Sequence, residues 1–258
     1  MIRFTDASVT YNGGVKALDN LNLEINEGEF IVVVGLSGAG KSTMIRAVNG
    51  LVPLTSGSLE VNGRDVGTQD RAGMRELRSE IGMVFQGFNL VNRTSVLNNV
   101  LMGRLHSVPT WRTLLGRYPD ADVELAAAAL DRVGILDKAR VRATDLSGGQ
   151  RQRVGIARAL AQEPKVILAD EPVASLDPPT SHVVMRYLKT ISSELGITTL
   201  VNLHFLDLAT EYADRIIGLR AGQLVFDGPG SECDASVFES IYGRSLTAED
   251  TLDEHAGL

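Results

Sequence analysis

One eight-residue loop limits the folds open to this chain more than any other feature. Residues 35–42, GLSGAGKS, match the pattern G-x-x-x-x-G-K-[ST]. An apolar, β-branched run, EFIVVVG (29–35), precedes the loop, and a short helical segment, KSTMIRAVNG (41–50), follows it. Glycines let such a loop curl so that its backbone N–H groups face phosphate oxygens, which the N-terminus of the helix also attracts. The order strand, glycine loop, helix therefore predicts a phosphate-binding site in an α/β protein.

The rest of the chain divides into segments with different periodicities. Residues 1–26 predict an antiparallel hairpin that turns at Asn12-Gly13-Gly14. Later strand patterns (81–85, 166–170, 197–203 and 216–219) alternate with helical ones (148–162 and 179–195), which predicts a mostly parallel sheet with flanking helices. We expect one α/β domain over residues 1–230, with a helical sub-domain at about 87–145 inserted in it. Residues 231–258 then supply one helix, 235–242, and an acidic tail whose last dozen residues are expected to be mobile.

Charge and composition exclude several classes of function. The net charge of −7 is concentrated in residues 231–258, which hold seven acidic residues and one arginine, so the body of the chain is nearly neutral. A neutral body gives no general field for a nucleic acid, and we expect none as a partner. A single cysteine, Cys233, excludes an internal disulfide and a multi-cysteine zinc site. Without an apolar run of about 18 residues or a secretory signal, we expect a cytoplasmic protein whose membrane role is peripheral.

The glycine loop needs an acidic partner, and the sequence has one. Lys41 can neutralise the β- and γ-phosphate charges, and the Ser42 hydroxyl is a hard ligand for Mg²⁺. The strand 166–170 ends in Asp170, followed by Glu171, at the sheet edge where open α/β sheets bind ligands. Asp170 is expected in the Mg²⁺ shell and Glu171 as the general base for the attacking water. Acidic pairs at strand ends are common, and it is the glycine loop that favours the catalytic interpretation.

A third motif, Leu146-Ser147-Gly148-Gly149-Gln150, opens the helical pattern RQRVGIARALAQ. Backbone N–H groups, the Ser147 hydroxyl and the helix dipole all favour an anion at this point. An ordinary helix cap explains Ser147. It does not explain the two glycines that follow, because glycines weaken a first helical turn.

With this motif in place, residues 1–230 resemble the ATP-binding-cassette (ABC) ATPases, whose signature reads LSGGQ. The resemblance implies a P-loop NTPase fold, ATP hydrolysis and a head-to-tail homodimer. Each ATP would lie between the glycine loop of one chain and Ser147 and Gly149 of the second copy.

The resemblance also implies roles for single residues. Tyr11 would stack on adenine, the Gln86 amide would reach Mg²⁺ while its loop faces a membrane partner, Asp177 would touch the other monomer, and His204 would bond the γ-phosphate. The expected nucleotide-binding set is Tyr11, Gly35, Ser37, Gly38, Ala39, Gly40, Lys41, Ser42, Thr43, Ser147, Gly148, Gly149, Gln150 and Asp177; the catalytic set is Glu171, His204 and Gln86; the metal set is Ser42, Gln86 and Asp170.

Each of these roles has a simpler structural alternative. Tyr11 serves equally as surface packing, Gln86 as a polar end to a strand, Asp177 as a helix cap and His204 as a satisfied polar residue. The other three histidines, His106, His182 and His255, fit no motif, and His/Cys metal ligation is unsupported.

Other segments resemble the ATP-binding subunits of bacterial phosphonate importers, notably FNLV (88–91), PTWRTLLG (109–116) and VNLH (201–204). Gly87 and Thr94 depart from that pattern and leave the partner contact less certain. The resemblance implies transmembrane permease subunits, an extracytoplasmic substrate-binding protein and a place on the cytoplasmic face of the bacterial inner membrane. Because the cargo never meets this chain, phosphonate, phosphite and phosphate all stay open.

Two other functions compete with transport. One is an ABC-type ATPase in a soluble assembly, such as a phosphonate-degrading complex or a DNA-repair clamp. An insert of about 60 residues leaves no room for a long coiled coil, and the body is not basic, which disfavours repair. The other is a nucleotide-gated binding module with little turnover, which the presence of Glu171 and His204 disfavours.

Overall fold

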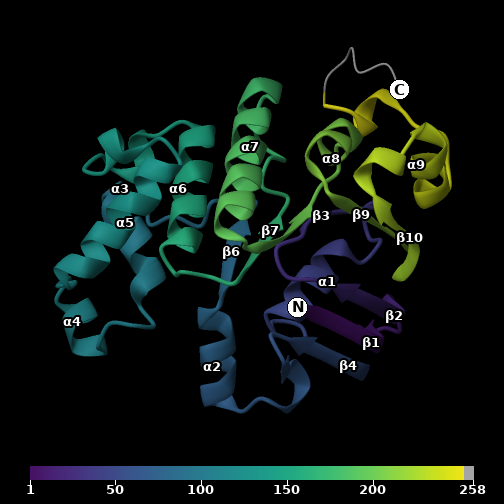
Figure 1. The fold of residues 1–258 in the computed structure, drawn as a ribbon, viewed down its shortest axis with the longest axis horizontal. Helices are drawn as coiled ribbons and strands as arrows, with labels where there is room; N and C mark the ends of the chain where they lie inside the picture. Colours follow the sequence, from purple (N-terminus) through teal and green to yellow (C-terminus); the bar gives the residue numbers. More distant parts are fainter. Residues whose placement is uncertain (253–258) are drawn as a thin grey trace.

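Two β-sheets and the helices around them make up the chain in a computed structural model that describes residues 1–252, apart from the side chains of Leu114 and Ala248 (Figure 1). One sheet has four strands in the order β2-β1-β4-β5, and the other has six in the order β10-β9-β3-β8-β7-β6. The expected arrangement, an N-terminal antiparallel β-subdomain beside a mostly parallel sheet with flanking helices, is confirmed. The strands are β1 Ile2–Thr10, β2 Lys16–Ile25, β3 Phe30–Val34, β4 Ser56–Val61, β5 Arg64–Asp65, β6 Ile81–Phe85, β7 Val166–Asp170, β8 Thr198–Asn202, β9 Arg215–Arg220 and β10 Gln223–Pro229.

Some of the helices pack on the two sheets, and others form a separate group at one end of the molecule. They are α1 Lys41–Val48, α2 Arg71–Ser79, α3 Val96–Leu101, α4 Thr110–Leu114, α5 Asp120–Arg132, α6 Gly148–Leu160, α7 Pro178–Leu195, α8 Leu206–Tyr212 and α9 Ala235–Tyr242. Helices α3, α4 and α5 lie on the left in Figure 1, on the far side of α7 from the antiparallel strands. Helix α6 packs against both α3 and α5 and so joins this group to the parallel sheet. No helix within residues 1–252 is long and apolar enough to cross a membrane.

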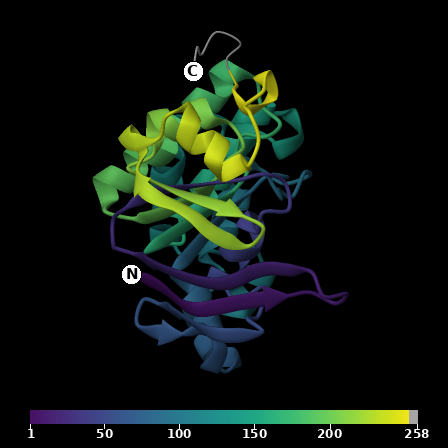
Figure 2. The ribbon, with the colours of Figure 1, turned by 90° about the vertical axis from the view of Figure 1, so that its right-hand side faces the viewer.

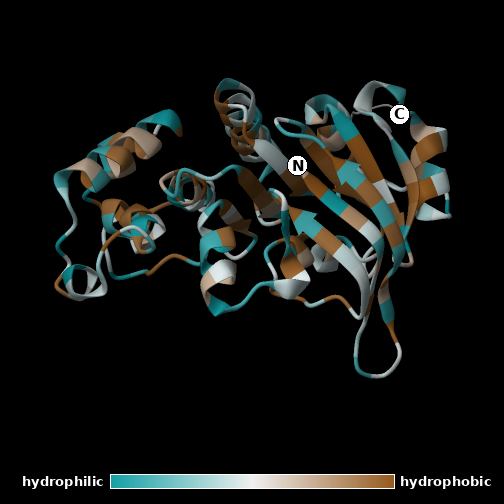
Figure 3. Cartoon of the chain, turned by 60° about the horizontal axis from the view of Figure 1, so that its bottom comes forward, coloured by the Kyte–Doolittle hydropathy of each residue, from teal (hydrophilic) through white to brown (hydrophobic). Residues whose placement is uncertain are grey.

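The central strands β3, β7 and β8 are buried at every position, which explains why they are rich in apolar residues. Alternate residues of β3 point to opposite sides, so Phe30, Val32 and Val34 join the core under the helices. Ile31 and Val33 join the second core, which is built with α1 and the antiparallel sheet. Figure 2 shows the antiparallel strands, in purple, below β9 and β10, and Figure 3 shows hydrophobic and hydrophilic residues alternating along the strands.

The register of the parallel strands brings their carboxyl ends to one edge. Strand β8 lies between β3 and β7, and Asn202 pairs in register with both Val33 and Asp170. On the other side of β7, Phe85 pairs with Asp170. The residues that follow β3, β6, β7 and β8 therefore meet at the same edge of the sheet.

The C-terminal segment differs in part from expectation. Helix α9 has the predicted bounds, but residues 247–252, expected to be mobile, form a capped turn. Asp250 is 6% exposed and accepts hydrogen bonds from the backbone N–H and the hydroxyl of Thr247. Asp250, one of the acidic residues of this tail, is therefore buried and caps the turn. Residues 253–258, the rest of the expected tail, lie outside the described residues.

Candidate active site

At two positions, the glycine loop between β3 and α1 has a backbone conformation that only glycine tolerates. Gly35 has φ 147° and Gly40 has φ 105°. A Cβ on Gly35 would lie 2.2 Å from the carbonyl oxygen of Leu219, and one on Gly40 would lie 2.2 Å from that of Ala17. Between them Ser37 and Gly38 are exposed, while Ala39 is buried and donates its N–H to the Leu36 carbonyl at 3.0 Å. Neighbouring strands therefore hold the loop in its curled shape.

Lys41, the first residue of α1, carries a buried positive charge into this loop. The side chain is 4% exposed, and Nζ donates to the carbonyl oxygens of Gly35 at 2.5 Å and Leu36 at 3.2 Å. Burial lowers its pKa to about 8, while the nearby charges of Glu171 and Asp170 partly oppose that shift. An incoming phosphate would give this ammonium a stronger partner than the two carbonyls.

Asp170 ends β7 in a small polar network. Its Oδ1 accepts from the Ser42 hydroxyl at 2.8 Å and from Asn202 Nδ2 at 2.8 Å, and its Oδ2 accepts from Arg46 at 3.1 Å. Asn202 Nδ2 also lies 3.2 Å from the Ser42 hydroxyl oxygen. The sequence predictions missed Asn202 and Arg46. Asn202 could have been found from the register, because it is the last residue of the strand beside Asp170.

The side chains at this point fit a magnesium ion. Ser42 and Asp170 offer a hydroxyl and a carboxylate oxygen, and Asn202 Oδ1 is buried without a hydrogen-bond partner among the described residues. Mg²⁺ prefers such oxygen ligands and takes one or two from the protein, with water and phosphate oxygens as the rest.

Glu171 and His204 face each other beside this network. His204 Nε2 lies 2.6 Å from Glu171 Oε1, and the two side chains are 38% and 20% exposed respectively. Glu171 has φ 52°, a left-handed conformation that is unfavourable for a glutamate, and its N–H donates to the Asn202 carbonyl at 3.2 Å. The strained backbone turns the Glu171 side chain away from the strand direction at the end of β7.

Two other expected residues lie near α1 and β6. Tyr11, next to the end of β1, is 45% exposed, and its hydroxyl lies 3.2 Å from the Thr43 hydroxyl in α1. Its ring is therefore presented beside the glycine loop. Gln86 directly follows β6 at the shared edge and is exposed.

The signature motif forms the N-terminal end of helix α6. Ser147 caps α6, and it and Gln150 exchange hydrogen bonds in a capping box, with Ser147 N–H to Gln150 Oε1 at 2.9 Å and Gln150 N–H to Ser147 Oγ at 3.3 Å. Asp177 caps α7 through the N–H and hydroxyl of Thr180. The helix-cap explanation thus holds for both residues. Gly149 also has a packing reason, since a Cβ there would lie 2.2 Å from the Thr180 methyl carbon.

The loop after Gln86 is fastened to the signature helix. Arg158 of α6 donates to the carbonyl oxygens of Phe88 at 3.1 Å and Asn89 at 2.6 Å. Its pKa is lowered by burial. Phe88 and Asn89 both have positive φ angles, so their carbonyls are turned toward this arginine by an unusual backbone. Arg158 therefore links the loop after Gln86 to α6.

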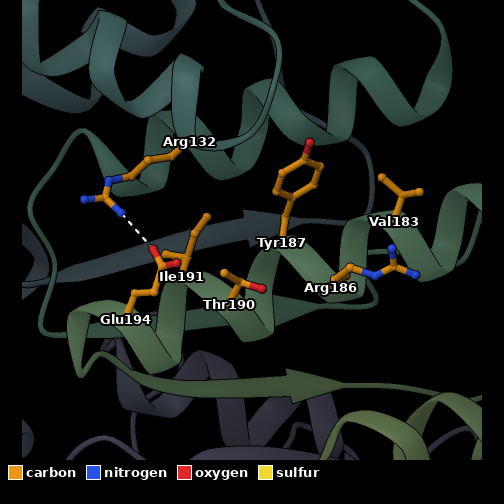
Figure 4. A pocket seen from close by; sticks show the side chains of 7 residues that line it. All are labelled: Arg132, Val183, Arg186, Tyr187, Thr190, Ile191 and Glu194. Carbon is orange, nitrogen blue, oxygen red and sulfur yellow. Dashed lines mark hydrogen bonds and ion pairs between the residues drawn. The ribbon is translucent and has the colours of Figure 1, made fainter.

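A cavity of about 400 Å³ lies away from these residues, between α5 and α7. It is lined by Arg132, Val183, Arg186, Tyr187, Thr190, Ile191 and Glu194. Arg132 pairs with Glu194 at its rim, as Figure 4 shows. It contains none of the expected nucleotide-binding or catalytic side chains.

A glycine cradle with a buried lysine, two carboxylates at the adjoining strand end and a separate LSGGQ helix tip on this two-sheet fold define an ABC ATPase. A family model described as ABC transporter matches residues 18–174, and the chain belongs to this family of ATP-binding, ATP-hydrolysing proteins.

Relatives in the same family match nearly the whole chain. The "Phosphonates import ATP-binding protein PhnC 3" of Halalkalibacterium halodurans is 56% identical over 98% of this chain and 98% of its own length. The "Phosphonates import ATP-binding protein PhnC 1" of Oceanobacillus iheyensis is 56% identical over 97% of each chain. A dimeric ATP-binding cassette solved in a post-hydrolysis state bound to ADP and Pi superposes with a TM-score of 0.78, at 33% identity, over 90% of this chain and 100% of that one.

Proposed function

We propose that this chain is the ATP-hydrolysing subunit of a bacterial ABC importer for phosphonates. The observation that carries the proposal is the convergence of Lys41, Asp170 and the Glu171–His204 pair at one sheet edge, in a chain that is 56% identical to two phosphonate import ATP-binding proteins.

The chemistry follows from the contacts at that edge. The glycine loop and Lys41 bind the β- and γ-phosphates, and Tyr11 stacks on adenine beside Thr43. Ser42, Asp170 and Gln86 would hold Mg²⁺, and the ion would spread the negative charge of the terminal phosphates. Glu171 accepts the proton of the attacking water, and His204 moves from Glu171 to the γ-phosphate and orients it. Loss of the γ-phosphate then removes the partner of Lys41 and His204.

We further propose that the working unit is a head-to-tail homodimer. Ser147, Gly148, Gly149 and Gln150 of one copy close over the ATP held by the other, and Asp177 contacts the second copy. Helix-dipole charge and backbone N–H groups at the start of α6 complement the γ-phosphate. ATP therefore closes the dimer and hydrolysis reopens it.

The proposed transport partners lie outside this chain. The permease binds over Gln86 and the loop to Val91, at the cytoplasmic face of the inner membrane. Residues 1–230 form the ATPase domain, and residues 87–145 form the helical sub-domain within it. An extracytoplasmic protein selects the cargo, for which the names of the relatives favour phosphonates over phosphite or phosphate.

Reconstitution with the permease and binding protein tests this function. Phosphonate-loaded binding protein should stimulate ATP hydrolysis several-fold in vesicles, and Glu171→Gln should abolish that turnover while ATP still binds. Undiminished turnover in Glu171→Gln would defeat the assigned base. If phosphate but not phosphonate stimulated ATP hydrolysis, the proposed cargo would be wrong. If the permease had no effect on ATP hydrolysis, the result would favour an ATPase of a soluble assembly.

A further inference from the structure

The C-terminal segment is tied to the stretch of backbone that carries His204. Tyr242, the last residue of α9, is 4% exposed, and its hydroxyl donates to the backbone carbonyl of His204 at 3.2 Å. Further along the chain, the N–H of Leu252 donates to Asp207 Oδ2 at 2.9 Å. These two contacts hold both ends of residues 204–207, where the chain passes from β8 into α8.

Tyr242 is itself held firmly. The guanidinium of Arg244 lies 5.4 Å from the centroid of the Tyr242 ring and forms two hydrogen bonds of 2.8 Å with the Asp250 carboxylate. Asp250 in turn caps the turn that begins at Thr247. The C-terminal turn therefore acts as a brace behind the tyrosine.

His204 depends on such contacts because it lies outside regular structure. It is two residues beyond the end of β8, and α8 begins only at Leu206. The preceding residue, Leu203, donates its N–H to the Val33 carbonyl at 3.1 Å, and the Tyr242 hydroxyl fixes the carbonyl of His204 itself. The imidazole that extends from this backbone meets Glu171 at 2.6 Å.

We propose that Tyr242 is a positioning residue for ATP hydrolysis: its hydroxyl fixes the His204 backbone and thereby sets the imidazole against Glu171. The proposal rests on the catalytic role proposed above for His204. Residue 242 lies beyond residues 18–174, the part that the family model matches.

The chemistry of the hydroxyl suits this role. Burial, followed by the charge of Asp250, raises the pKa of Tyr242, so the group stays protonated and remains a donor. A displacement of about 1 Å in a catalytic group can reduce a rate by about a hundredfold, and a lost hydrogen bond one step away should have a smaller effect.

Tyr242→Phe in the full-length chain tests the proposal, because it removes the hydroxyl and keeps the ring. We expect kcat for ATP hydrolysis to fall about tenfold, with KM for ATP unchanged within about twofold. Tyr212→Phe is the matched control: Tyr212 is also buried, and its hydroxyl also donates to a backbone carbonyl, that of His182, at 3.3 Å. This control should keep the wild-type kcat.

A spectroscopic measurement separates positioning from general stability. The chain has four histidines, so selective ¹⁵N-histidine labelling gives few ring signals, and His204→Gln assigns the relevant one. Tyr242→Phe should shift the ring signal of His204. Tyr212→Phe should shift that of His182, whose Nδ1 lies 3.1 Å from the Tyr212 hydroxyl, and should leave His204 unchanged.

Three outcomes would contradict either the positioning role of Tyr242 or the proposed function. A wild-type kcat in Tyr242→Phe, with His204→Ala inactive, contradicts the positioning role alone. A lower kcat without a shift of the His204 signal contradicts it as well. Full turnover in His204→Ala contradicts the proposed function itself. Should Tyr242→Phe fold poorly, Arg244→Met keeps the hydroxyl and removes its brace, and the proposal requires a smaller loss of kcat with a shift of the same ring signal.

Discussion

The charge state of Lys41 links nucleotide binding to pH. In the free chain its pKa is lowered, mainly by burial, to about 8, from an ordinary value of 10.5. A bound phosphate favours the ammonium and raises that pKa, so above pH 8 binding requires uptake of a proton. ATP affinity should therefore be constant up to pH 8 and then weaken, by at most about tenfold per pH unit.

Titration calorimetry from pH 7 to 10 measures this dependence. Lys41→Met should bind ATP more weakly at pH 7 by about 1.5–3 kcal/mol, because it loses a charge-assisted contact. It should also lose the weakening above pH 8. An affinity in the wild-type chain that stays level to pH 10 would contradict the buried position of the ammonium.

At the scale of elements, Gly149 joins packing and function in α6. A Cβ at this position would lie 2.2 Å from the Thr180 methyl carbon in α7. Gly149→Ala should therefore destabilise the chain by about 1–3 kcal/mol, seen as a lower midpoint of urea unfolding. Thr180→Ser removes the methyl group and keeps the hydroxyl that bonds Asp177.

The double variant Gly149→Ala/Thr180→Ser separates the two roles. It should regain most of the lost stability but still hydrolyse ATP slowly, because in the proposed dimer the added methyl group obstructs the approach of the other copy's nucleotide. Full recovery of hydrolysis together with stability would mean that Gly149 serves packing alone.

A buried arginine joins the helical group to α6. Arg104, in the turn after α3, is 7% exposed and bonds Asp122 of α5 at 2.6 Å and the carbonyl of Ala161 at 2.9 Å. Arg104→Met should lower the free energy of unfolding by about 3–5 kcal/mol, because it leaves the Asp122 carboxylate buried and unpaired. Adding Asp122→Asn should recover part of the lost free energy of unfolding. If Arg104→Met alone were as stable as the wild-type chain, solvent would have to reach the Asp122 carboxylate.

The elements that were predicted correctly carry their own local signal. The strands 81–85 and 166–170 and the helix 235–242 have the predicted bounds, since each is a short apolar run or a capped amphipathic one. Strand β10 was missed because none of its residues is fully buried, and β4 because only its last residues face the core. The helical pattern cannot show that Asp250 turns back to cap its own segment.

In the candidate site, too, some residues have a local sequence signal and others do not. The glycine loop and the acidic pair are contiguous, so the sequence displays them directly. Asn202 belongs to no motif, and only the register of β8 with β7 brings it to Asp170. Tyr242 and His204 are 38 positions apart, and their contact is a property of packing alone.

For the whole molecule, the glycine loop and the signature motif lie on different elements, at the start of α1 and the start of α6. Lys41, Asp170 and Glu171 converge on one edge of the parallel sheet, whereas Ser147 and Gln150 bond each other at the tip of α6. In the proposed head-to-tail homodimer, the glycine loop of each copy and the α6 tip of the other enclose one ATP, so the dimer holds two.

The molar mass of Glu171→Gln in solution, measured by light scattering with Mg²⁺ and ATP, tests the proposed ATP-dependent dimer most directly. We expect a stable dimer with ATP, a monomer with ADP, and a monomer again when Ser147→Arg is added to block the α6 tip. A Glu171→Gln chain that binds ATP yet remains monomeric at high concentration, with and without its permease, would contradict it.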